Sequence, residues 1–171
     1  VLAEGFAADD VLRLAAAVER ASEHPLALAV VAAADARSLA RAAVTDFDSP
    51  TGKGALGTVE GRKVVLGNAA FLQEHGIDTG PLADRADRLR AEGATAIFAG
   101  IGGRPAAILA IADPVKATTP AALKALETAG IRVVMLTGDN WTTARAIAAR
   151  LGLRPSTGTS RRRRSPTAAH T

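Results

Sequence analysis

The sequence predicts an α/β protein whose two parts are built differently. In residues 1–103, short apolar strands joined by glycine turns lie among Ala-rich or charged amphipathic segments, which predicts an antiparallel sheet flanked by helices. In residues 104–153, a continuous apolar run, a tight loop and a helix follow one another, which predicts an incomplete doubly wound α/β domain. Residues 154–171 contain Ser, Thr, Pro and Arg with no apolar period, so we predict a disordered tail.

The elements of the first part follow in order. Asp9 or Asp10 is predicted to cap a first helix, and a second helix is predicted over residues 25–38. Strands are predicted at 44–47, 55–59, 63–66 and 95–101, the middle two joined by Glu60-Gly61. Helices are predicted at 69–74, capped by Asn68, and at 81–91. The predicted inward-facing residues are Val11, Leu12, Leu14, Ala15 and Val18 in the first helix, Leu26, Val30 and Ala33 in the second, and Leu82, Ala86 and Leu89 in the fourth.

The second part is predicted to begin at the turn Gly102-Gly103. An apolar strand is predicted at 105–111, and a helix at 120–129 ends at Gly130. A strand at 131–136 is followed by Thr137-Gly138-Asp139-Asn140 and a helix at 142–150. Open sheets of this construction bind ligands at the carboxyl ends of their strands.

Composition and charge limit the possible functions. The chain of 171 residues is 48% hydrophobic but only 3% aromatic, so the core must be aliphatic. It has no cysteine and three widely spaced histidines, so we expect no disulfide and no metal site. No apolar run reaches the ~20 residues that span a bilayer, so we expect a soluble chain that faces the cytoplasm and does not insert into a membrane. Without residues 154–171 the chain has 16 basic and 17 acidic side chains, so its basic character lies in the tail.

The first candidate site is the corner between the two N-terminal helices. Pro25 holds His24 out of helical geometry, and Glu19 lies one turn back. A heteroaromatic ring can stack on an imidazole while its exocyclic amine donates to a carboxylate. The alternative is a helix-capping histidine beside a solvated glutamate.

The other candidates are glycine-rich or follow predicted strands. Gly52 and Gly54 would let backbone amides approach a phosphate or a nucleotide, and Gly67-Asn68 follows the hairpin; the alternatives are a plain turn and a helix cap. Thr137 and Gly138, with the segment from Asp113 to Lys116, are suited to hold a phosphoryl group.

Taken together, these motifs resemble heavy-metal-transporting P-type ATPases, copper-type ones included. Ser22-Glu23-His24-Pro25 is similar to the Ser-Glu-His-Pro signature of their nucleotide-binding domain. The segment 135–144 resembles their phosphorylation domain, which has the haloacid-dehalogenase fold. The resemblance covers residues 1–152.

The resemblance implies that Glu19 and His24 hold the adenine of ATP and that the pocket is lined by Gly52, Gly54, Gly67 and Asn68. It also implies that Thr137 and Gly138 hold the phosphoryl group, that Asp139 helps to seat the nucleotide, and that Lys116 is the basic residue after Asp-Pro. Lys53, inside the glycine loop, is a weaker candidate for contact with the phosphates.

Two motifs of that family are absent from the sequence. These are the Asp-Lys-Thr-Gly-Thr phosphorylation loop and the Gly-Asp-Gly-x-Asn-Asp loop that holds magnesium. We therefore expect a fragment, from a truncated or frameshifted gene, that binds ATP without turning it over. In the parent, ATP with Mg²⁺ would drive export of a metal ion, and the transmembrane and actuator domains would be the partners. The chain would be the cytoplasmic portion of an inner- or plasma-membrane protein.

Three alternatives stay open. A phosphatase of the haloacid-dehalogenase class would share the Thr-Gly-Asp segment but would need an N-terminal aspartate nucleophile after a strand. A nucleic-acid-binding module would act through Arg161–Arg164, but it lacks an aromatic platform, and we expect no nucleic-acid partner. The third is a non-catalytic nucleotide-binding remnant. The main interpretation requires that the corner, the two loop glycines and Gly67-Asn68 converge on one cleft.

Overall fold

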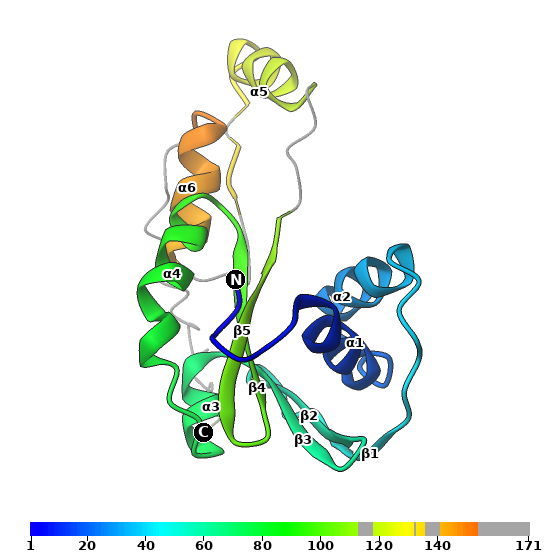
Figure 1. Ribbon diagram of the computed structural model, residues 1–171. Coiled ribbons are helices and arrows are strands. Elements are labelled where there is room, and N and C mark those ends of the chain that lie inside the picture. Colours follow the sequence, from blue (N-terminus) through cyan, green and yellow to red (C-terminus); the bar gives the residue numbers. More distant parts are fainter. Residues whose placement is uncertain (113–117, 132, 136–140, 154–171) are drawn as a thin grey trace, which may run out of the picture.

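The computed structural model describes residues 1–112, 118–131, 133–135 and 141–153. Its centre is a five-stranded antiparallel sheet in the order β1-β2-β3-β4-β5 (Figure 1). The strands are β1 (Val44–Asp48), β2 (Gly54–Val59), β3 (Arg62–Gly67), β4 (Thr95–Ile101) and β5 (Arg104–Ile111). The helices are α1 (Ala8–Glu19), α2 (Pro25–Ala36), α3 (Ala69–Glu74), α4 (Gly80–Ala91), α5 (Thr119–Thr128) and α6 (Trp141–Arg150). The predicted α/β class, an antiparallel sheet flanked by helices, is confirmed.

The sheet is covered on both faces, and each face has its own core. Alternate residues of β2 divide between them: Ala55 and Val59 join the core under α1 and α2, whereas Leu56 packs on the core under α3 and α4. Figure 1 shows the two helix groups on opposite sides of the sheet. The inner face of α1 is fully buried over Val11, Leu14 and Val18, as the apolar pattern predicts.

Two details of the N-terminal helices differ from the prediction. Neither Asp9 nor Asp10 caps α1, because the helix begins at Ala8 with Ala7 at its N-cap, and both aspartates lie in the first turn. There their charges suit the positive end of the helix dipole. The buried face of α2 is Ala27, Val30 and Ala34 rather than the predicted Leu26, Val30 and Ala33.

The central hairpin matches the prediction closely. Glu60 and Gly61 both have positive φ, 51° and 72°, as a two-residue type I′ turn requires. β2 and β3 then pair without interruption from Val59–Arg62 to Gly54–Gly67. Asn68 caps α3 as predicted, because its Oδ1 accepts a hydrogen bond of 2.9 Å from the Phe71 N–H.

The sheet continues through the predicted domain boundary. Gly102 and Gly103 form the turn between β4 and β5, and β5 pairs with β4 along its length. Leu2 in turn pairs with Ala107 at the outer edge of β5. The antiparallel sheet therefore extends to Ile111.

The predicted strand at 131–136 is wrong where the structure describes it. Residues 131 and 133–135 have no regular secondary structure, and residues 132 and 136 lie outside the described part. An apolar run becomes a strand only when another strand pairs with it, and none of the described strands pairs with this run. The helices on either side, α5 and α6, form as predicted. Among the described residues, no helix is both long and apolar enough to cross a membrane.

Candidate functional site

The corner between α1 and α2 has the predicted backbone geometry. His24 is the N-cap of α2, in extended conformation at φ −71° and ψ 137°, and Pro25 occupies the first helical position. The His24 Nδ1 accepts a hydrogen bond of 3.2 Å from the Leu26 N–H, so the predicted capping alternative is realised. Because Nδ1 is an acceptor, the proton of the neutral ring is assigned to Nε2. The ring is exposed, and capping therefore leaves its face open to a ligand.

Glu19, at the C-terminal end of α1, is not the solvated charge of the alternative interpretation. The residue is only 7% exposed. Burial raises the pKa of its carboxyl, while Ser22 and His24 act in the opposite direction. The same Ser22 accepts a hydrogen bond of 3.2 Å from the backbone N–H of His24 at its Oγ. The Ser22 N–H also donates to the Glu19 carbonyl at 3.0 Å, so backbone bonds of the turn keep Glu19, Ser22 and His24 next to one another.

The four predicted glycine-region residues form a second group. Gly54 and Gly67 face each other across the β2–β3 ladder. The Asn68 backbone N–H donates to the Lys53 carbonyl at 3.1 Å, and its side-chain Nδ2 donates to the Gly52 carbonyl at 3.4 Å. Asn68 therefore holds the glycine loop at the N-terminus of α3. Gly52 itself has φ of 75° and open space where a side chain would stand.

Lys53 is held away from the loop by an ion pair. Its Nζ lies 2.8 Å from both carboxylate oxygens of Glu74 at the end of α3. Both side chains are about half exposed, so the pair is open to solvent and to competing anions. The hypothesis that Lys53 contacts phosphate requires this pair to separate.

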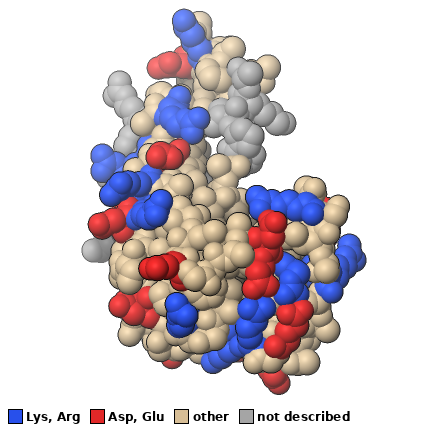
Figure 2. Space-filling view, in the orientation of Figure 1, with Lys and Arg blue, Asp and Glu red and all other residues tan. Residues whose placement is uncertain are grey.

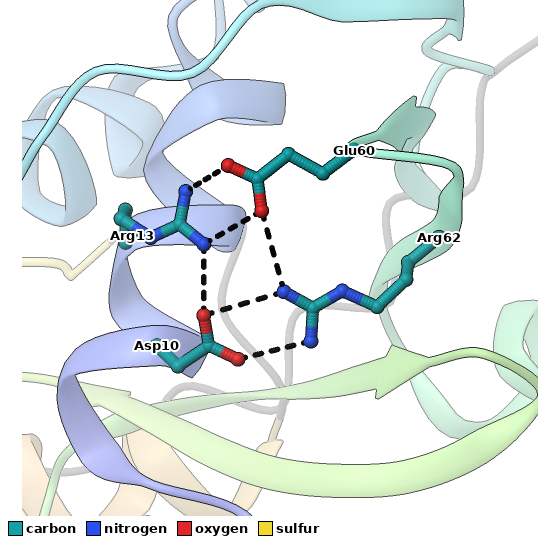
Figure 3. Close-up of polar contacts among 4 residues, drawn as sticks. All are labelled: Asp10, Arg13, Glu60 and Arg62. Atoms are coloured by element: carbon teal, nitrogen blue, oxygen red, sulfur yellow. Dashed lines mark hydrogen bonds and ion pairs between the residues drawn. The ribbon is translucent and has the colours of Figure 1, made fainter.

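α1 runs toward the end of β2 that carries Gly54. Near the start of α1, the Arg13 Nη1 lies 2.6 Å from Oε1 of Glu60, in the β2–β3 turn (Figure 3). Further along, a Cβ at Gly57 would lie 3.6 Å from Cγ2 of Val18. The helix therefore runs antiparallel to β2, and its C-terminal residue Glu19 points toward the end of β2 that carries Gly54.

The remaining predicted site residues are not described. Lys116, Thr137, Gly138 and Asp139 all lie outside the described residues. In the part of the chain that is described, no three His, Cys, Asp or Glu side chains come together as a metal site would require.

Two contributors were not singled out from the sequence. Ser22 belongs to the Ser-Glu-His-Pro motif. A serine two residues before the histidine could have predicted the hydrogen bond from the His24 N–H to its hydroxyl. Glu74 lies 21 residues from Lys53, and no local pattern indicates that pairing.

Comparison with known proteins agrees with this architecture. A family model for haloacid dehalogenase-like hydrolases matches residues 2–161. The chain belongs to this family. It is 46% identical over 154 residues to a copper-exporting P-type ATPase of Legionella pneumophila subsp. pneumophila, with 90% of this chain and 21% of that protein covered. It is 53% identical over 143 residues to a silver exporting P-type ATPase of Salmonella typhimurium, with coverage of 84% and 17%. The chain thus spans about a fifth of the length of these curated relatives.

Solved structures give the same result for this member of the haloacid dehalogenase-like family. A zinc-transporting PIB-type ATPase in the E2.Pi state superposes with a TM-score of 0.69 at 31% identity, over 90% of this chain and 25% of that one. The N-domain of a copper-transporting P-type ATPase gives a TM-score of 0.50 at 27% identity, over 63% of this chain and 89% of that one. The predicted resemblance to heavy-metal-transporting P-type ATPases is confirmed.

Proposed function

We propose that this chain is the ATP-binding cytoplasmic portion of a P-type ATPase that exports a heavy-metal cation, with copper the first candidate. The observation that carries the proposal is the buried Glu19 carboxyl at the end of α1, five residues before the exposed His24 that caps α2. A buried carboxylate beside an open imidazole face is suited to an aromatic ring that carries an amine. Adenine has both features.

The glycine group supplies the second half of the proposed pocket. Gly52, Gly54, Gly67 and Asn68 lie together, at the end of β2 toward which α1 carries Glu19. Backbone without side chains can approach the ribose and phosphates of a nucleotide closely. We propose that ATP lies between the corner and this loop, with its Mg²⁺ ion bound through the phosphates.

The phosphoryl end of the reaction is assigned by sequence alone. We propose that Thr137, Gly138, Asp139 and Lys116 contact the phosphoryl group in the whole protein. The phosphorylation and magnesium motifs of the resembled family are not among the 171 residues. We propose that the chain of 171 residues binds ATP without turning it over. Hydrolysis and ion transport would then require the transmembrane and actuator domains as partners.

Calorimetric titration of ATP into the chain and three variants tests the proposal. His24→Ala and Glu19→Gln should each weaken binding by about tenfold or more, because they remove the stacking face and the charged acceptor. His75→Ala is the matched control: it removes the half-buried histidine at the end of α3, which lies beside Lys63 near the opposite end of the hairpin. Equal ATP affinity in wild type, His24→Ala and Glu19→Gln would refute the adenine site.

A further inference from the structure

Lys53 carries the only positive charge of the glycine loop, taken as residues 49–54. Its chain neighbours on both sides are glycines, and a Cβ at Gly52 would meet no atom within 4 Å. The lysine therefore has open space beside it in the loop. Its Nζ nevertheless lies 2.8 Å from both carboxylate oxygens of Glu74. The charge that a phosphate-binding loop would use is thus neutralised by a residue of α3.

Backbone bonds attach the loop to α3 without the help of this ion pair. The Asn68 N–H donates to the Lys53 carbonyl at 3.1 Å, and the Asn68 Nδ2 donates to the Gly52 carbonyl at 3.4 Å. The Lys53 N–H donates to the Pro50 carbonyl at 3.1 Å. These bonds fix the backbone of the loop, so separation of Lys53 from Glu74 would free a side chain and leave the loop in place.

The position of Glu74 does not serve α3. Glu74 is the last residue of this helix, where a negative charge is unfavourable because it faces the negative end of the helix dipole. Its side chain is 50% exposed and that of Lys53 is 48% exposed. Ion pairs as open as this one are weak, so an anion of higher charge can take the lysine. An ammonium group has three donors, and two of them serve Glu74.

We propose that Glu74 sets the preference of the glycine loop for nucleotides with several phosphates, because it competes with those phosphates for Lys53. A triphosphate carries more negative charge than one carboxylate and draws the lysine away from Glu74. A monophosphate carries less charge and does so less well. This inference rests on the proposed function of the loop. Lys53 would contact the phosphates, whereas Glu74 acts through Lys53 and does not touch the nucleotide.

The test is calorimetric titration of ATP and of AMP, each with excess Mg²⁺ at low salt, into wild type, Glu74→Gln, Lys53→Gln and the double variant. Glu74→Gln removes the competitor and should tighten ATP binding about threefold, and Lys53→Gln should weaken it about threefold. AMP affinity should change much less in both. In the double variant, Glu74→Gln should add nothing to Lys53→Gln, because no lysine remains to be released. All these differences should shrink in 1 M NaCl.

The double variant separates competition from direct repulsion. If Glu74→Gln tightens ATP binding equally with and without Lys53, the carboxylate repels the phosphates itself and the proposal is overturned. Equal changes for ATP and AMP would also overturn it, because the pair would then act on the structure of the loop. Glu4→Gln and Lys63→Gln remove the same charges at exposed positions elsewhere and should bind as wild type does. All the substituted side chains are exposed, and urea denaturation verifies that the variants fold.

A further comparison keeps this inference apart from the proposed adenine site. Wild-type ATP affinity in both Glu74→Gln and Lys53→Gln, while His24→Ala still loses affinity, would overturn the role of the ion pair alone. If His24→Ala and Glu19→Gln bind ATP normally, the proposed adenine site fails instead. Titration of inorganic tripolyphosphate into the same variants then still tests whether Glu74 and a polyphosphate compete for Lys53.

Discussion

Gly54 on β2 and Gly67 on β3 approach each other so closely that neither position has room for a side chain. A Cβ at Gly54 would lie 1.9 Å from the Leu66 backbone oxygen and 2.7 Å from the Cα of Gly67. A Cβ at Gly67 would lie 2.4 Å from the Lys53 backbone oxygen. The contacts are with backbone, which cannot swing aside. The two glycines are therefore required by the fold, whatever they also contribute to a ligand.

Substitution of Gly54 should accordingly cost more stability than substitution of Gly52. Gly54→Ala must displace the neighbouring strand, and we expect it to lower the free energy of unfolding by about 3 kcal/mol. Gly52→Ala meets no atom within 4 Å and is opposed only by its positive φ, so about 1 kcal/mol is expected. Urea denaturation of both variants measures the difference. Equal losses would show that the close approach at Gly54 is relieved at little cost.

Glu19 should lower the stability of the fold at neutral pH, whatever its proposed role in binding ATP. Burial raises its pKa above the value in the unfolded chain. The contribution of such a group is fully present below the unfolded pKa of about 4.3 and is lost as the pH rises through the folded pKa. Glu19→Gln removes this loss, so the variant should unfold at a higher urea concentration than wild type at pH 7.

Denaturation of Glu19→Gln at several pH values checks the sign. The advantage over wild type should shrink as the pH falls toward 4, while ATP affinity remains weaker at pH 7. Glu4→Gln, at an exposed glutamate, is the matched control and should show neither effect. A Glu19→Gln variant less stable than wild type at pH 7 would indicate that the ionised carboxylate stabilises the corner.

An ion network joins α1 to the β2–β3 hairpin. Arg13 contacts Asp10 at 2.9 Å and Glu60 at 2.6 Å, and Arg62 contacts Asp10 at 3.0 Å and Glu60 at 3.5 Å (Figure 3). Figure 2 shows acidic and basic side chains in close alternation over this part of the surface. The hydrogen bonds from the two arginines hold the pKa of Asp10 and of Glu60 below their usual range. Carboxylates lowered in this way stabilise the fold above their unfolded pKa, and this is lost as the pH falls through the folded value.

Arg13→Ala should therefore destabilise the protein at neutral pH and low salt, by less than Gly54→Ala does. The difference from wild type should diminish in 1 M NaCl, because the network is open to solvent, and also below about pH 4. Thermal denaturation at two salt concentrations measures it. Arg41→Ala, at a largely exposed arginine 3.6 Å from Asp35, is the control. A loss that is independent of both salt and pH would assign the role of Arg13 to packing of its aliphatic stem.

Much of this fold could be predicted because the relevant interactions are local. The hairpin turn at Glu60-Gly61 and the cap at Asn68 each depend on two or three neighbouring residues and formed as predicted, and the cap at His24, given as an alternative, is equally local. The inward face of α2 could not be predicted, because an Ala-rich helix is apolar all round and no face is marked. The absence of a strand at residues 131 and 133–135 has a related cause, since an apolar run does not specify a pairing partner.

The site divides in the same way. The types and spacing of Glu19 and His24 are visible in the sequence, whereas the burial of Glu19 depends on how α2 packs against α1. The pairing of Lys53 with Glu74 depends on where α3 docks. Neither packing event leaves a periodic or local signal.

Thr143 fixes the C-terminal helix α6 to the rest of the described structure. It is 1% exposed, and its Oγ1 donates to the Ala94 carbonyl at 3.1 Å, just before β4. Beside it, a Cβ at Gly93 would lie 3.5 Å from Cγ1 of Ile147, and the Arg150 Nη1 donates to the Glu92 carbonyl at 3.4 Å. Three successive turns of α6 thus lie against residues 92–94. Of these two hydrogen bonds, the one from Thr143 is buried and the one from Arg150 is exposed, so we expect the first to matter more.

Thr143→Val keeps the shape of the side chain but leaves the buried Ala94 carbonyl without this donor. The expected cost is about 1–2 kcal/mol, felt as undocking of α6 and not as global unfolding. Amide hydrogen exchange should accelerate about tenfold in α6 and at the start of β4 while α1 and β2 keep their protection. Thr143→Ser retains the hydroxyl and should exchange nearly as wild type does. Uniform acceleration across all elements would instead show that α6 unfolds only with the whole sheet, and unchanged exchange in Thr143→Val would show that packing alone holds the helix.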